Sequence, residues 1–380
     1  MQFSKIIGHQ ALKQQLIATV EENRVSHAQL FLGPEGSGSL ALAVAYAQYI
    51  NCENKLLNDS CGHCSSCNKY EKLIHPDLHF SYPFFAKKNE KTAAIFMEDW
   101  RAAFLSNPYL GLGYWTAQLE AENKQANIPI DEAHDIIKKL SLKAFEAEYK
   151  VLIMWLPEYL DTQGNALLKL IEEPPEKTLF ILVAENQDKI LNTIISRTQL
   201  VKVHKLSHGE LTQYLTEVQK IEPNRANEIS FIADGNLQSA FNQIQESANE
   251  RLELLIRWLR SIVTDSGLAI IQLCDEELSK LGRENQKNFL IYSINILRQI
   301  VLLNQGLSNL VFIKDAELEF VTRFSEITSL DKLEFAIEML EKTHYSVERN
   351  ANPKILFLDL SLQLVLVFKY NTFPMETQYI

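Results

Sequence analysis

The feature that most constrains the fold is a mostly apolar run that leads into a glycine-rich loop and then into a helix-forming segment. Residues Ala28–Leu32 form the run, and the loop Gly33–Gly38 follows it. Leu40–Ile50 is rich in Ala and Leu, which favour helices. A strand, a phosphate-type loop and a helix in this order are typical of a doubly wound parallel sheet. The pattern predicts an α/β domain built around such a loop.

Three other short apolar segments bounded by polar turns predict further strands, and they are Val151–Leu156, Leu179–Ala184 and Gln199–Val203. We expect the last two to be buried on both faces, as strands of a parallel sheet are. A helix over Ala166–Glu173 must end before Pro174 and Pro175, because each proline lacks an N–H and restricts the residue before it. Residues 1–200 therefore predict an α/β domain with a parallel sheet.

Strand patterns stop near residue 205, and helical periodicity replaces them. We expect a small helical lid over residues 201–248 and an all-α C-terminal domain over 249–380, with a boundary that rests on the polar stretch Gln245–Arg251. The segment Phe80–Ala126 interrupts the α/β pattern and is interpreted as an insertion. Its aromatic side chains are expected to pack on one another or on the host domain, and an interaction surface is the alternative.

Composition limits the class of protein. With 46% apolar and 22% charged residues, the chain has the balance of an ordinary globular protein without disordered bias. No stretch approaches about 18 uninterrupted apolar residues, and the N-terminus lacks a signal pattern, so we expect a cytoplasmic protein without membrane association. The net charge of −11 disfavours autonomous DNA binding, which draws its affinity from Lys and Arg on phosphates.

Four of the five cysteines are crowded into sixteen residues, as Cys52, Cys61, Cys64 and Cys67, here called the cysteine cluster. Four thiolates at this spacing can close a tetrahedron around Zn²⁺ without an open position, which predicts a structural zinc site in a module over residues 52–67. Reduced thiols without metal, or a Cys3His site that uses His63 or His75, are the alternatives. The fifth cysteine, Cys274, lies in an apolar run and is expected to be a core thiol.

The glycine-rich loop departs from a working phosphate-binding loop. An ATPase of this type has Lys and then Ser or Thr after its last glycine, the Lys for the phosphates and the hydroxyl for Mg²⁺. Here those positions hold Ser39 and Leu40. Gly33, Gly36 and Gly38 can still form an anion-cradling turn, so weak phosphate contact is an alternative, but functional ATP binding is not expected.

The end of the Val151–Leu156 strand departs from the ATPase pattern as well. That position should carry two acidic residues, one for Mg²⁺ and one to activate water. The sequence has Trp155 and Leu156 there, and Glu158 is displaced by two residues. Two independent losses predict a chain that does not hydrolyse ATP in its own site.

Arg197, within Ser196-Arg197-Thr198, is a candidate for catalysis in a neighbouring subunit. It follows the segment Ile190–Ile195 and precedes a strand, at what we expect to be a domain rim. An arginine that reaches across an interface stabilises the charge of a transferring phosphate and is worth about 10³–10⁵ in rate. The alternative is an arginine that is solvated or paired locally.

In this order, the motifs resemble the clamp-loader branch of AAA+ ATPases, and in particular its ATP-inactive, zinc-carrying members. The matching runs extend from residue 6 to about 360 and leave Phe80–Ala126 and much of the C-terminal domain unmatched. They are Ile7–Gln10, Ser26–Pro34, the cysteine cluster with His75–Asp77, Asn165–Lys169, Glu172–Pro175, Ser196–Arg197 and Asn350–Lys354.

The resemblance implies an α/β ATPase-like domain with an inserted zinc module, a helical lid, and a helical collar that joins a five-membered ring. It implies a non-catalytic stator of the DNA polymerase III clamp loader, with gamma/tau motor subunits and a delta subunit as partners. Primed DNA would be reached through the complex, and no small-molecule substrate is implied. Arg197, with Ser196, would be offered to a neighbour's ATP site, although Thr198 replaces the family's Cys. ATP-binding relatives carry a lid Arg where this sequence has Gln238, so a further nucleotide contact is missing.

Two other functions stay open. An active motor ATPase of the same loader would hydrolyse nucleotide as an isolated chain, and Ser39 and Leu40 argue against it. A zinc-dependent nucleic-acid-binding module would show salt-sensitive DNA affinity on its own, and the acidic net charge argues against it.

Overall fold

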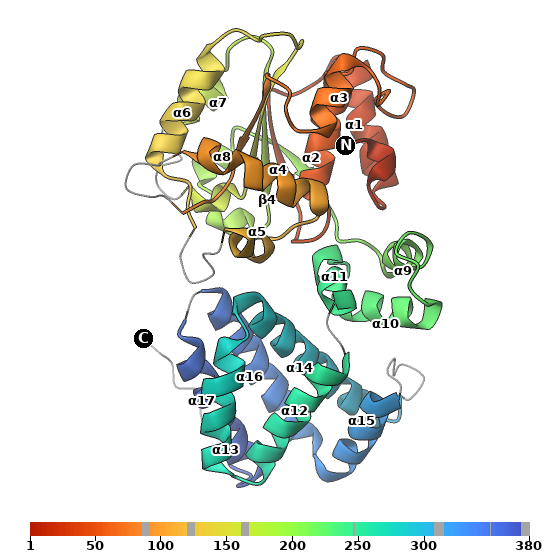
Figure 1. Cartoon of the computed structure of the whole chain (residues 1–380), viewed down its shortest axis with the longest axis vertical. Coiled ribbons are helices and arrows are strands. Elements are labelled where there is room, and N and C mark those ends of the chain that lie inside the picture. Colours follow the sequence, from red (N-terminus) through yellow and green to blue (C-terminus); the bar gives the residue numbers. More distant parts are fainter. Residues whose placement is uncertain are drawn as a thin grey trace. The chain divides into compact units, whose positions relative to one another are not determined.

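The computed structural model of the protein describes residues 1–85, 92–119, 126–160, 167–245, 248–307, 315–349 and 351–373. The chain divides into two compact units (Figure 1). The first comprises Met1–Pro223 and Ala233–Gln238, and the second comprises Asn224–Ile232 and Ser239–Ile380. The boundary at residue 248 between lid and C-terminal domain stays a prediction. Among the described helices, none is long and apolar enough to cross a membrane.

The first unit is built on a five-stranded parallel sheet with the order β2-β3-β4-β1-β5. Leu32 is paired with Ala184, and Trp155 with Val183, so the carboxyl ends of β1, β3 and β4 meet at one edge. The predicted parallel sheet is confirmed, and it brings the glycine-rich loop beside the end of β3. The strands are β1 (Ala28–Leu32), β2 (Leu78–Ser81), β3 (Lys150–Trp155), β4 (Thr178–Ala184) and β5 (Gln199–Lys202).

Two features of the sheet correct the sequence predictions. β2 includes Phe80 and Ser81 and pairs with β3, so the sheet extends into the segment interpreted as an insertion. β2 is hard to find in the sequence because it has only four residues, although apolar and polar residues alternate in it. β5 is not buried on both faces: of its four residues Val201 alone is buried, because the strand lies at the edge of the sheet beside β1.

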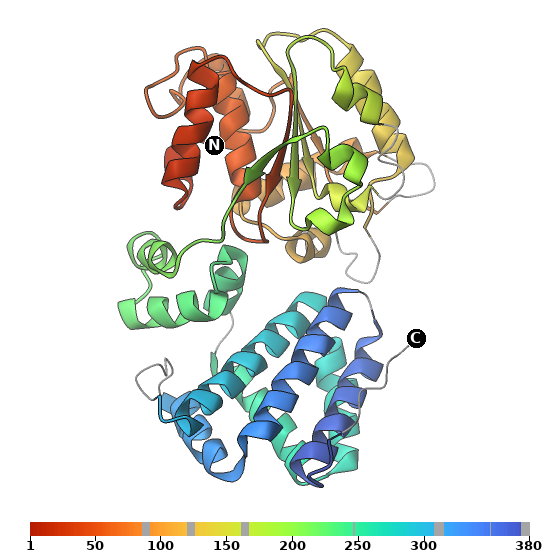
Figure 2. The same ribbon diagram turned by 180° about the vertical axis from the view of Figure 1, so that it is seen from behind.

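Helices cover both faces of the sheet. Helices α1, α2 and α3 lie on one side and α6 and α7 on the other, as Figures 1 and 2 show from opposite directions. Every residue of α2 is buried, which explains its apolar, Ala-rich sequence, and α7 ends before Pro174 as predicted. The helices are α1 (Gln10–Glu21), α2 (Ser39–Ile50), α3 (Ser65–Glu71), α4 (Met97–Ser106), α5 (Leu112–Gln118), α6 (Ile130–Ser141), α7 (Leu168–Glu172), α8 (Asn192–Ile195) and α9 (His208–Glu217).

The segment after β2 packs its aromatic side chains inside the first unit. The rings of Tyr82 and Trp100 are stacked with centroids 4.2 Å apart, and Trp100 also contacts Trp155 of β3 at 5.2 Å. Trp115 Nε1 donates a hydrogen bond to the carbonyl of Pro83 at 2.7 Å. For the described residues, the expected packing of these aromatics on one another and on the host domain is confirmed.

The second unit is built of helices. Trp258 is fully buried, and its Nε1 donates to Ser361 Oγ at 2.9 Å. Cys274 Sγ lies 3.6 Å from the same oxygen and is fully buried, so the predicted core thiol is confirmed. Two helices, α10 (Pro223–Ala233) and α11 (Leu237–Gln245), have end residues in the first unit. The others are α12 (Ala248–Val263), α13 (Gly267–Gln272), α14 (Arg283–Asn304), α15 (Asp315–Ile327), α16 (Leu330–Glu348) and α17 (Pro353–Phe368).

Some sequence predictions fall on residues that the structure does not describe. Ala166, predicted as the first residue of the helix observed as α7, is one of them, and so is Asn165. Asn350 of the C-terminal matched run is another, and so are residues 86–91 and 120–125 of the segment interpreted as an insertion.

Candidate functional site

The cysteine cluster is a candidate metal centre. Its four sulfur atoms all lie within 4.8 Å of one another, and Cys61 Sγ is 3.9 Å from Cys67 Sγ. Sulfurs around a tetrahedral zinc, with Zn–S bonds of about 2.3 Å, lie about 3.8 Å apart. Cys52 follows the end of α2, Cys64 caps the start of α3, and Cys67 lies within it, so two helices position three of the four cysteines, and Cys61 lies in the loop between them. The four residues therefore fit a closed metal site.

Backbone N–H groups of the cluster point at its sulfur atoms. The amides of Cys61, Cys64 and Cys67 donate to the sulfurs of Cys52, Cys61 and Cys64, each at 3.3 Å. Hydrogen bonds of this kind favour the charged thiolate. Burial acts the other way and raises the pKa of the Cys52 and Cys67 thiols, and a divalent cation reverses that effect by stabilising the thiolates.

Neither histidine considered as an alternative ligand joins the cluster. His75 is buried, its Nδ1 accepts the N–H of Asp77 at 3.1 Å, and its Nε2 lies 3.4 Å from Glu146 Oε1. His63 is exposed, with Nδ1 2.9 Å from the carbonyl of Cys61. Among the described residues, the donor atoms that come together are the four sulfurs.

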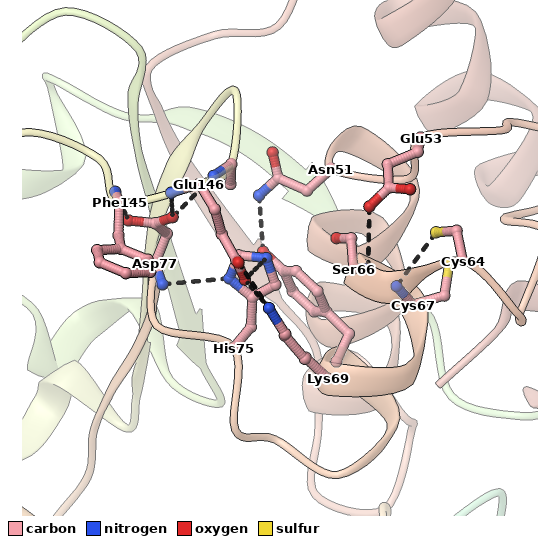
Figure 3. Close-up of polar contacts among 12 residues, drawn as sticks. Asn51, Glu53, Cys64, Ser66, Cys67, Lys69, His75, Asp77, Phe145 and Glu146 are labelled. Carbon is pink, nitrogen blue, oxygen red and sulfur yellow. Dashed lines mark hydrogen bonds and ion pairs between the residues drawn. The ribbon is translucent and has the colours of Figure 1, made fainter.

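A polar network next to the cluster fastens the loop before β3 (Figure 3). The carboxylate of Asp77 accepts hydrogen bonds from the amides of Phe145, Glu146 and Ala147 at 2.6, 2.9 and 2.8 Å. Burial alone would raise the pKa of Asp77, but the three N–H groups outweigh it and hold the pKa below its ordinary value of 3.8. Lys69 of α3 places Nζ 2.6 Å from both oxygens of Glu146. The network thus ties α3 and the residue before β2 to the loop before β3.

The glycine-rich loop lies between β1 and α2, as predicted. Gly36 and Gly38 have positive φ angles of 70° and 90°, which a glycine adopts without strain. Ser39 Oγ is 2.9 Å from Ser37 Oγ, and Ser39 and Leu40 are both buried. The cavity left beside the loop has a volume of about 20 Å³.

The end of β3 borders the same small cavity. Trp155 lines it, together with residues at the end of β4. Glu158 accepts hydrogen bonds from the amides of Glu185 and Asn186 at 2.6 and 2.8 Å, so its carboxylate fastens the turn after β4. Burial raises the pKa of Glu158 above its ordinary value of 4.5 although these N–H groups lower it.

Gln238 lies at the start of α11 and is buried beside the loop. Its Oε1 accepts a hydrogen bond from Asn107 Nδ2, and the amide of Leu237 donates to the carbonyl of Gly36 at 3.2 Å. The structure therefore brings Gln238, the glycine-rich loop and the end of β3 into one region.

Arg197 lies just after α8 with 33% of its side chain exposed. Its Nε forms an ion pair with Glu172 at the end of α7, and its Nη1 donates to the carbonyl of Thr193 at 2.8 Å and to Ser196 Oγ at 3.3 Å. The guanidinium is held by local partners and remains partly open to solvent.

With this geometry in view, comparison with known proteins identifies the family. A family model described as DNA polymerase III, delta subunit, matches residues 8–207, more than half of the chain. The chain belongs to this family. The match includes the cysteine cluster, the glycine-rich loop and Arg197.

Three relatives are DNA polymerase III subunits. Subunit tau of Bacillus subtilis is 22% identical over 93% of this chain and 60% of its own length. Subunit gamma of Buchnera aphidicola subsp. Schizaphis graminum is 23% identical over 97% of this chain and 96% of its own length. Subunit delta prime of Bacillus subtilis is 28% identical over 56% of this chain and 52% of its own length. The chain thus covers less than two thirds of the tau and delta prime relatives.

Two parts of the site in this DNA polymerase III delta-subunit family member were not predicted from the sequence. The loop-fastening role of Asp77 was missed, although His75-Pro76-Asp77 stood out as a matching run. The contacts of Asn107 and Tyr109 with the glycine-rich loop region were missed too, since nothing in their own sequence surroundings indicates a partner far away in the chain.

Proposed function

We propose that this chain is the delta prime subunit of the DNA polymerase III clamp loader, a non-catalytic stator that supplies Arg197 to the ATP site of a neighbouring subunit. The observation that carries the proposal is the pair Ser39 and Leu40, buried where an ATPase has its phosphate-binding Lys and its Mg²⁺-binding hydroxyl. Membership of the DNA polymerase III delta-subunit family supports a place in that assembly.

Further residues support an inactive site. Trp155 and Leu156 stand where acidic residues would hold Mg²⁺ and activate water, and both side chains are buried. Glu158, the nearest carboxylate in the sequence, binds backbone amides after β4. Without a cation opposite the phosphates or a ligand for the metal, the electrostatic stabilisation that drives phosphoryl transfer is missing.

Arg197 suits a role in trans because its charge is permanent and its side chain is partly exposed. Its partner Glu172 is 44% exposed, so the pair is solvated and weak, and a neighbour's γ-phosphate can compete for the guanidinium. The proposed partners are gamma/tau motor subunits and a delta subunit in a pentamer. Primed DNA would be bound by the complex.

We further propose that the cysteine cluster holds a structural zinc ion. The four cysteines would fill all coordination positions and leave none for water, so the ion would fold the module and take no part in ATP chemistry.

The test is ATP turnover by the loader reconstituted with wild-type chain, with Arg197→Ala or with Arg197→Lys. The Ala variant should assemble normally and lower DNA-stimulated turnover, and Lys should restore it in part at most, because it lacks the planar fork that binds phosphate oxygens in two places. Arg24→Ala is the matched control, since Arg24 is also paired locally and is 72% exposed. If the loader with Arg197→Ala hydrolysed ATP as fast as the wild-type loader, Arg197 would not act in the ATP site of a neighbouring subunit.

A motor subunit of the same loader is the second candidate, because the tau and gamma relatives match over 93% and 97% of the chain and the delta prime relative over 56%. ATP hydrolysis by the isolated chain decides between the two. The delta prime proposal expects none, and measurable turnover that is lost on changing residues of the glycine-rich loop would favour the motor.

A further inference from the structure

The turn between α4 and α5 lies against the glycine-rich loop. Tyr109 of this turn is buried, and a Cβ atom placed on Gly38 would lie 2.7 Å from Cε1 of its ring. The Tyr109 hydroxyl accepts the N–H of Ile7 at 2.8 Å. One side chain thus contacts the loop and the segment before α1.

Asn107 of the same turn contacts Gln238 at the start of α11. Its Nδ2 donates to Gln238 Oε1, and its Oδ1 accepts the N–H of Tyr109 at 3.0 Å. Asn107 and Gln238 are 5% and 4% exposed, so this contact is shielded from water.

Two further side chains pack closely against the loop and the turn. A Cβ on Gly36 would lie 2.0 Å from Asn236 Oδ1, and one on Gly111 would lie 2.5 Å from Glu35 Oε1. The side chains of Asn236 and Glu35 are therefore in close contact with backbone of the loop and of the turn. Little freedom is left between these segments.

The space that this packing leaves beside the loop is small. The cavity of about 20 Å³ has room for one water molecule, which needs roughly 10–15 Å³. Pockets that bind small molecules and cofactors have volumes of about 300–1,000 Å³. Pro108, Tyr109 and Leu110 line the space beside the loop together with Trp155.

We propose that the turn Asn107–Leu110 is a built-in substitute for nucleotide. Its side chains connect the glycine-rich loop with Ile7 and Gln238, and they hold this region in one conformation whether or not ATP is present. The idea deepens the proposed stator role and rests on the proposed loss of ATP binding. It also gives part of the segment after β2 a function.

The test is amide hydrogen exchange of the isolated full chain, measured for wild type, Tyr109→Ala, Tyr109→Phe and Tyr114→Ala. Tyr109→Ala should speed exchange in Gly33–Ser39 and at Leu237 by about tenfold or more, since local opening sets these rates. Tyr109→Phe keeps the ring against Gly38 and should speed exchange mainly at Ile7. Tyr114→Ala is the control, because Tyr114 lies on the adjacent α5 and bonds the Ser106 hydroxyl.

The same measurement with millimolar Mg·ATP completes the test. The proposal expects ATP to leave exchange of the wild-type loop unchanged. Protection of the wild-type loop by ATP would overturn it, and so would exchange in Tyr109→Ala equal to wild type. If Tyr109→Ala does not fold, the effect of Tyr109→Phe at Ile7 decides, and its absence overturns the proposal. Because no loader is present, these outcomes are independent of the Arg197 experiment.

Discussion

The cysteine cluster and the glycine-rich loop both belong to the first unit, but they depend on the rest of the chain in opposite ways. The cluster draws its four ligands from sixteen consecutive residues and orders them with its own backbone amides. The loop lies between β1 and α2, as a phosphate-binding loop would, and its surroundings come from Ile7, Tyr109, Trp155 and Gln238.

This difference shows that a local motif and its surroundings are separate sources of evidence for a site. At the cluster, spacing, sulfur geometry and hydrogen bonds all indicate the same metal site. At the loop, Gly36 and Gly38 have positive φ angles, while Ser39 and Leu40 are buried. Conformation alone is therefore weak evidence for nucleotide binding.

The largest expected effect is at the cysteine cluster. Cys67→Ser should lose the bound metal and unfold the module, because apparent binding free energies of structural zinc reach about 10–16 kcal/mol in small zinc domains. Metal content by mass spectrometry and thermal unfolding measure both effects. Cys274→Ser is the control, since this thiol lies in the core of the second unit. Full zinc content in Cys67→Ser would show that the cluster is not a four-cysteine site.

Asp77→Asn tests whether the module is held to the sheet by charge. Because the buried carboxylate accepts three hydrogen bonds, the substitution should lower the free energy of unfolding by roughly 2–4 kcal/mol. The zinc content should not change. Glu148→Gln is the control, because Glu148 is 55% exposed in its pair with Lys177 and should matter little. A loss no greater than in that control would contradict the role of Asp77.

The pH dependence of the free energy of unfolding, compared between wild type and Asp77→Asn, tests whether the charge of Asp77 is responsible. The pKa of folded Asp77 lies below its ordinary value of 3.8, so the carboxylate stabilises the fold above about pH 4, and this contribution is lost as pH falls through the folded pKa. Urea unfolding at pH 7 and pH 3 should show the gap between wild type and Asp77→Asn narrowing at the lower pH. A gap independent of pH would mean that the charge is not the cause.

Gly38→Ala tests the tight packing of the glycine-rich loop. Its φ of 90° and the Tyr109 ring 2.7 Å from the added Cβ predict a loss of about 1–3 kcal/mol in stability. Gly209→Ala, on α9 with no heavy atom within 4 Å of its added Cβ, should be neutral or gain up to about 1 kcal/mol. Chemical denaturation measures both, and equal effects would mean that the loop is not closely packed.

The smallest expected effect is at the Glu172 pair. Glu172→Gln should change the free energy of unfolding by less than about 1 kcal/mol. The side chains of Arg197 and Glu172 are 33% and 44% exposed, and ion pairs that are open to solvent contribute little. A loss of several kcal/mol in urea unfolding would mean that Arg197 is fixed as part of the fold, and such an arginine would not be free to reach a neighbouring subunit.

Sequence patterns predicted the parts of this molecule that depend on near neighbours. The strands β1, β3 and β4, the buried helix α2 and the cysteine cluster all carry their information within a few residues. β2 was missed because it has only four residues, too short a run to stand out although apolar and polar residues alternate in it. The contacts of Asp77 with Phe145–Ala147 and of Asn107 with Gln238 join positions about 70 and 131 residues apart, which no local pattern records.

The central claim is tested most directly by ATP hydrolysis measured first on the isolated chain and then on the loader reconstituted with wild type or Arg197→Ala. The account predicts no turnover by the chain alone, turnover by the wild-type complex, and a fall in that turnover on loss of Arg197 with the complex still assembled. Turnover by the isolated chain, or a complex indifferent to Arg197, would contradict it.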